Sequence, residues 1–300
     1  MKPLGEYING NYTVRIYSDG TKVRFNDLDN LTPEFPESID LKITNMCDMG
    51  CPACHEASTM YGNHADIMNL PFIDTMHPYT EIAIGGGNPL EHPDLEAFLV
   101  KLKEKNLIAS MTVNGKHFIR EIDRLRSYKE RGVIHGLGVS YHPNLTMTEY
   151  VKFCEYMASF SDAVLHVIAG MISPGEFRNL SERCKRILVL GFKKLRRGDI
   201  YFQNNASSVI SGIFRLRLAV AELIEQNNGC TLCFDNLALE QLGIKSLVGE
   251  DRWKKLYMGG DGQYTMFVDA VTGEYSASST NANRYPITEN LTEMFTKIRR

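Results

Sequence analysis

Three cysteines, Cys47, Cys51 and Cys54, lie in the stretch Thr44 to Glu56, TNMCDMGCPACHE, with the spacing CxxxCxxC. A short loop with this spacing can turn three thiolates toward one centre, and thiolates favour iron–sulfur clusters, zinc or copper(I) over harder cations. A cubane [4Fe–4S] cluster normally takes four cysteines, so a loop that supplies three leaves one iron open to a ligand that is not protein. The loop therefore predicts a metal centre at which chemistry can take place.

A zinc site is the alternative for the same loop. His55 directly follows Cys54 and would complete a Cys3His zinc site. This alternative predicts a non-catalytic binding module that folds around one zinc ion.

Alternating strands and helices are expected around and after the loop. Helical segments at 92–105 and 117–131 carry apolar residues on one face, at i, i+3, i+4 and i+7. Short apolar strands are expected around residue 41 and at 81–85, 108–113, 135–141, 164–170 and 187–192. Strands separated by one-faced helices predict six β/α units in a parallel sheet that helices cover on its outer face.

The two ends of the chain have a different pattern. Residues 12–25, YTVRIYSDGTKVRF, predict a β-hairpin that turns at Asp19 and Gly20. A long helix at 208–225 and a second hairpin, turning at Thr272 and Gly273, predict a C-terminal α+β extension. We therefore expect an N-terminal hairpin appendage in 1–36, a central unit in 37–200 and an extension in 201–300.

Composition limits the class of protein. The chain has 300 residues, of which 43% are hydrophobic and 23% charged, as in a globular protein. We expect no membrane association, because no apolar run is long enough to span a bilayer, and the N-terminus lacks the layout of a signal peptide. Seven cysteines, three of them in one loop, suit a reducing compartment, so we expect the cytoplasm. A net charge of −3 indicates no general nucleic-acid surface.

A glycine triplet follows the second strand of the central unit, in the stretch AIGGGNPLEHPDL. With the cysteine loop after the first strand, it resembles the radical S-adenosylmethionine (SAM) superfamily, whose second motif is of the type GGE. The resemblance covers roughly residues 38–200 and implies a partial (β/α)6 barrel of the TIM type. The chain also resembles compact radical SAM proteins of tailed bacteriophages in the stretches MCDMGCPACHEAS, IAIGGGNPLEHPDL and FDNLALEQLGI.

The resemblance implies a particular chemistry. Cys47, Cys51 and Cys54 would hold three irons of a [4Fe–4S] cluster, and SAM would chelate the fourth. An electron from a flavodoxin or a ferredoxin would then cleave SAM to a 5′-deoxyadenosyl radical, which abstracts hydrogen from a substrate. The substrate is a small molecule, nucleotide, nucleic acid or peptide, with a slight preference for a nucleotide or nucleic acid. The sequence leaves the oligomeric state open.

Candidate SAM-binding residues follow the strands, since ligands of parallel α/β folds bind at the carboxyl ends of strands. Glycines at this edge let the backbone approach the methionine end of SAM. The candidates are Gly85, Gly86, Gly87, Asn88, Asn114, Ser140 and His166, with Met171 as a further residue near adenine or substrate.

Two residues depart from the pattern of the superfamily. Ala53 stands where members usually have an aromatic residue beside the adenine, and Asn88 stands where an acidic residue helps to hold the SAM amino group. An amide oxygen can accept a hydrogen bond from an ammonium group but brings no charge. A third hypothesis is therefore a degenerate barrel that binds cluster and SAM and regulates a partner without turnover.

Other motifs are weaker. Cys230 and Cys233 form a CxxC, which we interpret as part of a cysteine-poor relative of the twitch extension without a second cluster, the alternative being an auxiliary cluster. Cys154 and Cys184 are expected to be buried packing residues. The basic run KKLRRG at 193–198 is interpreted as a solvated face, with contact to a phosphate or nucleotide as the alternative. For His55, Glu56, His64 and Asp66, substrate recognition and a solvated loop remain equal alternatives.

Overall fold

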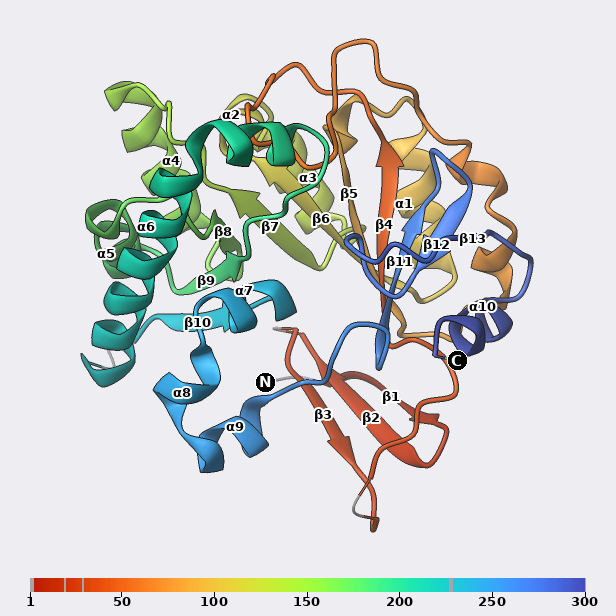
Figure 1. The fold of residues 1–300 in the computed structure, drawn as a ribbon. Helices are drawn as coiled ribbons and strands as arrows, with labels where there is room; N and C mark the ends of the chain where they lie inside the picture. Colours follow the sequence, from red (N-terminus) through yellow and green to blue (C-terminus); the bar gives the residue numbers. More distant parts are fainter. Residues whose placement is uncertain (1–2, 19, 29, 227–228, 300) are drawn as a thin grey trace.

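A ten-stranded sheet and a separate three-stranded sheet organise the protein in a computed structural model that describes residues 3–18, 20–28, 30–226 and 229–299 (Figure 1). The large sheet has the strand order β10-β9-β8-β7-β6-β5-β4-β11-β12-β13. No helix in the described part of the chain is long and apolar enough to cross a membrane.

The six strands expected from the sequence are neighbours in chain order. They are β4 (Ser38–Thr44), β5 (Glu81–Gly86), β6 (Ile108–Asn114), β7 (Gly136–Ser140), β8 (Val164–Ile168) and β9 (Arg186–Leu190). Each pairs in parallel with the next. This confirms the α/β class and the large parallel sheet, while the curvature of a partial barrel stays a prediction.

Helices connect these strands. They are α1 (Leu95–Glu104), α2 (Gly115–Arg120), α3 (Ile122–Glu130), α4 (Met147–Ser159) and α5 (Pro174–Arg183), with short 3-10 helices η1 (Ile67–Asn69), η2 (Pro71–Thr75) and η3 (Pro89–Glu91). Thr146 and Ser173 begin α4 and α5 with capping boxes that satisfy the first free N–H groups. The helix expected at 117–131 is two helices, because Glu121 leaves the helical conformation at φ −109° and ψ 23°.

The two faces of the parallel strands differ in character, because successive side chains of a strand point to opposite faces. On β6, Met111 and Val113 are buried in the main core, together with Phe98 of α1 and Phe153 of α4. Thr112, between them, faces the other way and is partly accessible. One face is thus covered by helices, and we call the other the open face.

The C-terminal segment adds strands to both edges of the parallel sheet. Its helix α6 (Arg197–Gln226) begins in the basic run, earlier than expected, and bends at Asn205. β10 (Thr231–Phe234) pairs in parallel with β9, and β11 (Thr265–Asp269) pairs in parallel with β4. The other elements are β12 (Glu274–Ser276), β13 (Tyr285–Pro286), α7 (Asn236–Gln241), α8 (Ile244–Val248), α9 (Glu250–Leu256) and α10 (Leu291–Ile298). The expected hairpin is formed by β11 and β12.

The N-terminal sheet contains one strand more than the predicted hairpin. β2 (Tyr12–Tyr17) and β3 (Lys22–Phe25) pair as expected, and β1 (Pro3–Asn9) joins the other edge of β2. Asp19 of the turn lies outside the described residues. The sheet is tied to the start of β4 through buried Glu37, which accepts hydrogen bonds from Tyr12 Oη at 2.6 Å and Arg24 Nε at 2.7 Å. The three-part division of the chain stays a prediction.

Because neighbouring residues of β6 face different sides of the sheet, we expect their substitutions to differ in how much they lower the free energy of unfolding. Met111→Ala is expected to lower the free energy of unfolding by about 2–5 kcal/mol, because it leaves a cavity in the core. Thr112→Ala, one residue along the same strand, should cost less than about 1 kcal/mol. Urea unfolding of both variants measures the difference, and equal losses would contradict the assignment.

Candidate functional site

The cysteine loop leaves the end of β4 and folds back on itself. The Cys47 amide donates to Thr59 O at 2.8 Å, and the Thr59 amide donates to Asn45 O at 3.1 Å. Within the loop the Cys54 amide donates to Cys51 O at 3.2 Å. All three cysteines are half-buried, so their thiols lie where protein can shield a bound metal centre without closing it.

The three thiols lie close enough to affect one another electrostatically. Burial raises the pKa of the Cys47 thiol, and the nearby Cys51 and Cys54 thiolates raise it further. A single tetrahedral zinc with Zn–S bonds of about 2.3 Å would bring its sulfurs to about 3.8 Å from one another. Among the described residues, the one set of three potential ligands within 4.8 Å of one another is Cys47, Asp48 and His117. The three cysteine sulfurs do not form such a set, and their soft chemistry suits an iron–sulfur cluster as well as zinc.

The glycine segment at the end of β5 is packed against the start of the cysteine loop. The Gly87 amide donates to Thr44 O at 2.7 Å, and the Asn88 amide donates to Met46 O at 2.6 Å. A Cβ on Gly87 would lie 2.2 Å from Met46 O, and one on Gly86, whose φ is +113°, would lie 2.4 Å from Thr44 O. A Cβ on Gly85 would meet nothing within 4 Å. The close contact with the cysteine loop therefore requires glycine at positions 86 and 87. Gly85 differs from them, because the space beside its backbone is open.

Asn88 is fully buried and already has partners. Its Oδ1 accepts a hydrogen bond from the Leu90 amide at 3.3 Å and so caps η3. Its Nδ2 donates to Glu91 Oε1 at 3.3 Å. The side chain therefore holds the chain after the glycines in place, a role that the sequence did not indicate.

Asn114, Ser140 and His166 lie side by side on three adjacent strands. Asn114 pairs with Ser140, and Ser140 pairs with His166, in the register of β6, β7 and β8. Asn114 Oδ1 also caps α2 by accepting the Lys116 amide at 2.9 Å. Burial lowers the pKa of His166 to about 4, so its ring is neutral near pH 7. The structure therefore brings these three predicted residues together in one row; Met171 lies in the turn after β8.

A buried ion network lies under the cysteine loop. Lys42 Nζ on β4 contacts Glu56 Oε2 at 2.6 Å and Asp269 Oδ2 on β11 at 2.9 Å. Burial alone would raise the pKa of the Glu56 carboxyl, but His55 and Lys42 hold it below its usual range. Arg196 Nη1 is a further partner at 3.2 Å. The lysine in the apolar strand SIDLKIT is the one signal in the sequence for a buried ion pair, but only the fold identifies Asp269 as its partner.

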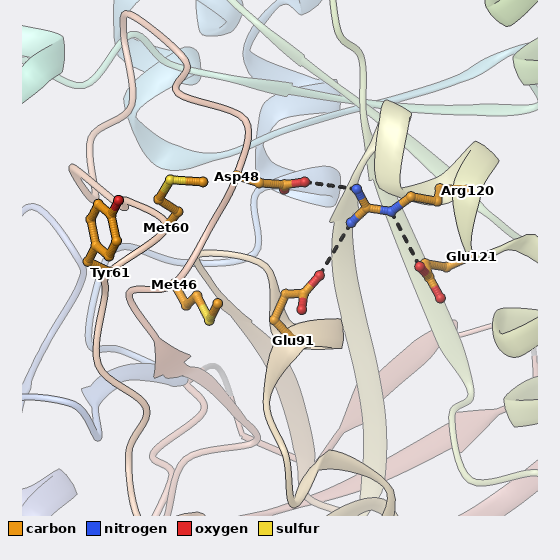
Figure 2. A pocket seen from close by; sticks show the side chains of 7 residues that line it. All are labelled: Met46, Asp48, Met60, Tyr61, Glu91, Arg120 and Glu121. Atoms are coloured by element: carbon orange, nitrogen blue, oxygen red, sulfur yellow. Dashed lines mark hydrogen bonds and ion pairs between the residues drawn. The ribbon is translucent and has the colours of Figure 1, made fainter.

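A second polar group surrounds a cavity of about 490 Å3 beside the loop (Figure 2). Arg120 extends between three carboxylates and contacts Asp48 at 2.8 Å, Glu91 at 3.3 Å and Glu121 at 3.3 Å. Buried His117 contacts Asp48 Oδ1 from Nε2 at 2.5 Å. Burial opposes ionisation of Asp48, but Arg120 and His117 lower its pKa to about 2. Two residues of helix α2 thus hold Asp48, the residue next to Cys47, in place. The sequence did not predict this contact.

Buried polar atoms without a hydrogen-bond partner gather at the loop. Four of the six such side-chain atoms among the described residues belong to the loop or to residues that contact it: Asn45 Oδ1, Ser58 Oγ, His117 Nδ1 and Arg197 Nε. Buried polar groups are nearly always paired in folded proteins. Their concentration here indicates that the loop is shaped around a group that brings further donors and acceptors.

The basic run at 193–198 is partly solvated, with Lys194 and Arg196 exposed, but its side chains also make specific contacts. Arg196 Nη1 donates to His55 O at 2.9 Å, and Arg197 Nη2 donates to Ser58 O at 2.9 Å. Lys193 Nζ donates to Ser279 Oγ at 2.9 Å, and Lys194 lies over the Phe202 ring at 3.6 Å. The run therefore supports the cysteine loop and the C-terminal segment.

The remaining cysteines are neighbours of one another. Cys184 is buried at the end of α5, and the Cys154 and Cys230 thiolates add to the effect of burial in raising its pKa to about 12. Cys233 is exposed on β10. The packing role expected for Cys154 and Cys184 agrees with their contact to the main core, but their proximity to Cys230 was not foreseen.

Comparison with solved structures places the fold beside SuiB of Streptococcus suis. SuiB bound to precursor peptide SuiA matches with a TM-score of 0.60 and 13% identity over 88% of this chain and 65% of SuiB. SuiB bound to S-adenosylmethionine matches with a TM-score of 0.59 and 13% identity over 88% and 66%. A third SuiB structure gives a TM-score of 0.57 and 11% identity over 97% and 86%. The match thus spans just under two thirds of SuiB in the two complexes, and this likeness concerns the fold. No protein-family model and no curated protein matches the sequence.

The packing of the glycine segment predicts that its members differ in their tolerance of a side chain. Gly87→Ala is expected to destabilise the protein by about 1–3 kcal/mol, because the new methyl group must displace the Met46 carbonyl. Gly85→Ala is the matched control and should stay within about 0.5 kcal/mol. Thermal unfolding of the two variants checks this. A Gly87→Ala protein as stable as the control would refute the contact.

Proposed function

We propose that the chain is a radical SAM enzyme in which Cys47, Cys51 and Cys54 hold a [4Fe–4S] cluster. The observation that carries the proposal is that the two sequence motifs are in direct contact. The Gly87 and Asn88 amides donate hydrogen bonds to the backbone that leads into the cysteine loop. The likeness of the fold to SuiB bound to S-adenosylmethionine supports it. A partial (β/α)6 barrel, with 201–300 as a cysteine-poor, twitch-like extension, belongs to the same proposal.

The cluster and SAM, when bound, supply one-electron cleavage of SAM and hydrogen abstraction from a substrate. The protein's own residues bind, orient and shield. The ion network of Lys42, Glu56 and Asp269 holds the loop against the sheet, and Arg120 and His117 fix Asp48 beside Cys47. A flavodoxin or ferredoxin is the class of electron donor that this chemistry requires.

We assign SAM to the open face at the strand ends. Ser140 and His166 lie there in one row with Asn114, and Gly85 leaves its backbone open. Asn88 is occupied by its own cap, so the acceptor for the SAM ammonium group must come from elsewhere. Asn45 Oδ1 suits this role, because it is a buried acceptor without a partner just before the cysteines.

A peptide is the substrate class that we now favour. SuiB, whose fold this chain shares, was solved bound to precursor peptide SuiA. The slight preference for a nucleotide rested on the basic run, whose side chains instead contact the cysteine loop, Ser279 and Phe202. No other feature of the described residues revives that preference.

Two rival functions remain distinguishable from this proposal. A zinc-stabilised binding module would need a compact set of four ligands, yet His55 pairs with Glu56 at 3.3 Å. A regulator that binds cluster and SAM without turnover is favoured by Ala53 and Asn88. The two rivals differ in metal content, and the regulator differs from the enzyme only in product formation.

The cluster ligands give the first test of this function. After anaerobic reconstitution we expect about four iron and four sulfide per chain. Dithionite and SAM should then yield 5′-deoxyadenosine, measured by mass spectrometry. Replacing Cys47, Cys51 and Cys54 by alanine should abolish both cluster and product, whereas Cys233→Ala, an exposed control, should retain them. One zinc and no iron would establish the binding module, and cluster with SAM binding but no product would establish the regulator.

The assignment of Asn45 gives a second test. Asn45→Ala is expected to weaken SAM binding to the reconstituted protein by about 10- to 100-fold, since a hydrogen bond to a charged group is worth about 1.5–3 kcal/mol. Asn63→Ala removes an exposed amide in the same loop and should leave the affinity unchanged. Equilibrium dialysis with labelled SAM measures both. Equal affinities would remove Asn45 from the site.

A further inference from the structure

The N-terminus of α6 is seated on the cysteine loop. A Cβ on Gly198 would lie 2.3 Å from Lys193 O, so the turn that begins the helix requires glycine, and it would lie 3.4 Å from Ala53 O, in contact with the cysteine loop. Arg196 donates to His55 O, and Arg197 donates to Ser58 O. The positive N-terminal end of the short helical segment before Asn205 and two guanidinium groups thus lie against the segment that carries the cysteines.

One N–H group of Arg197 has no hydrogen-bond acceptor among the described residues. Its Nη2 donates to Ser58 O at 2.9 Å, which orients the guanidinium toward the loop. Its Nε is buried and has no partner among the described residues. Ser58 Oγ is a second buried atom without a partner at the same place. Two unpaired groups on adjoining side chains indicate a missing acceptor.

Arg197 lies against the part of the loop that carries Cys51 and Cys54. The next residue, Gly198, approaches the backbone of Ala53 between these two cysteines, and Arg197 itself donates to Ser58 O. The unpaired Nε–H is therefore on the side of α6 that meets the cysteine loop.

An iron–sulfur cluster would supply the missing acceptor. Its thiolates and sulfides accept hydrogen bonds, and such bonds, together with nearby charge, set the reduction potential. A [4Fe–4S] cluster held by three thiolates is an anion, and reduction adds a further negative charge. A fixed cation and N–H donor therefore stabilise the reduced cluster more than the oxidised one.

We propose that Arg197 donates a hydrogen bond from Nε to a cysteine sulfur of the loop or to a sulfide of the cluster, and thereby makes the cluster easier to reduce. Arg197 acts as a positioning and tuning residue of the cluster. This inference rests on the proposed function, because it requires the cluster. It assigns to the basic run a role in electron transfer instead of substrate recognition.

The test is the reduction potential of the reconstituted full-length protein. Arg197→Gln removes the positive charge and the Nη2 group that bonds Ser58 O, and leaves an uncharged amide near the former position of Nε. We expect the midpoint potential to become more negative, so that at a fixed potential the ratio of reduced to oxidised cluster falls at least about tenfold. Arg215→Gln, an exposed position farther along α6, is the matched control and should leave the potential unchanged. Electron paramagnetic resonance of poised samples reports the reduced fraction.

A spectroscopic measurement on the wild-type protein completes the test. With 15N-labelled arginine, pulsed resonance of the reduced cluster should detect a nitrogen coupling that disappears in Arg197→Gln and persists in Arg215→Gln. An unchanged potential together with no coupling would overturn the inference and leave the cluster assignment intact. A wild-type protein without iron and sulfide would instead overturn the proposed function.

If Arg197→Gln does not bind a cluster, the reduction potential of Arg197→Lys tests the inference instead. Lysine keeps the charge but loses the planar fork that binds Ser58 and the sulfur together. Cluster retention with a more negative potential and no arginine coupling would support the inference. A wild-type potential in this variant would overturn it.

Discussion

Two backbone hydrogen bonds determine where the cysteine loop of this protein is located. Gly87 and Asn88 donate to the carbonyls of Thr44 and Met46, and they join the end of β5 to the backbone between β4 and the first cysteine. Only residues without a Cβ allow the two segments to approach so closely, because a side chain at Gly86 or Gly87 would overlap a carbonyl oxygen. The direction of the cysteine loop, and hence of its thiols, follows from this contact.

Charges then hold the loop from three sides. Lys42 lies below it with Glu56 and Asp269, Arg120 and His117 hold Asp48 at one end, and Arg196 and Arg197 approach from α6. Buried ion pairs seldom add much stability, since desolvation offsets their attraction. In this protein the ion pairs instead fix the position of the loop, because each pair joins the loop to a different element. Cations around a thiolate centre also favour the anionic state that metal binding requires.

The sequence predicted the parallel strands well, because apolar runs of four to six residues between one-faced helices admit few other arrangements. It also predicted that the cysteine and glycine motifs would meet at one edge of the sheet. It could not predict the partners of Asn88, because an amide that caps η3 and one that faces a ligand look alike in sequence. The contacts of the basic run with the cysteine loop could not be predicted for a similar reason, since only the path of α6 turns Arg196 and Arg197 toward the loop. Contacts such as Lys42 with Asp269 depend on register between distant strands, which local pattern does not encode.

The pairing of β4 with β11 has a consequence for the order of events during synthesis. Lys42 and Asp269 are separated by 227 positions in the chain, so one edge of β4 stays unpaired during synthesis until β11 has been made. During that interval Lys42 lacks one of its two carboxylate partners. A metal centre held by the cysteines would meet a more open and more hydrated pocket before β11 is in place than afterwards. The strand that covers this edge of β4 is thus made long after the loop that it supports.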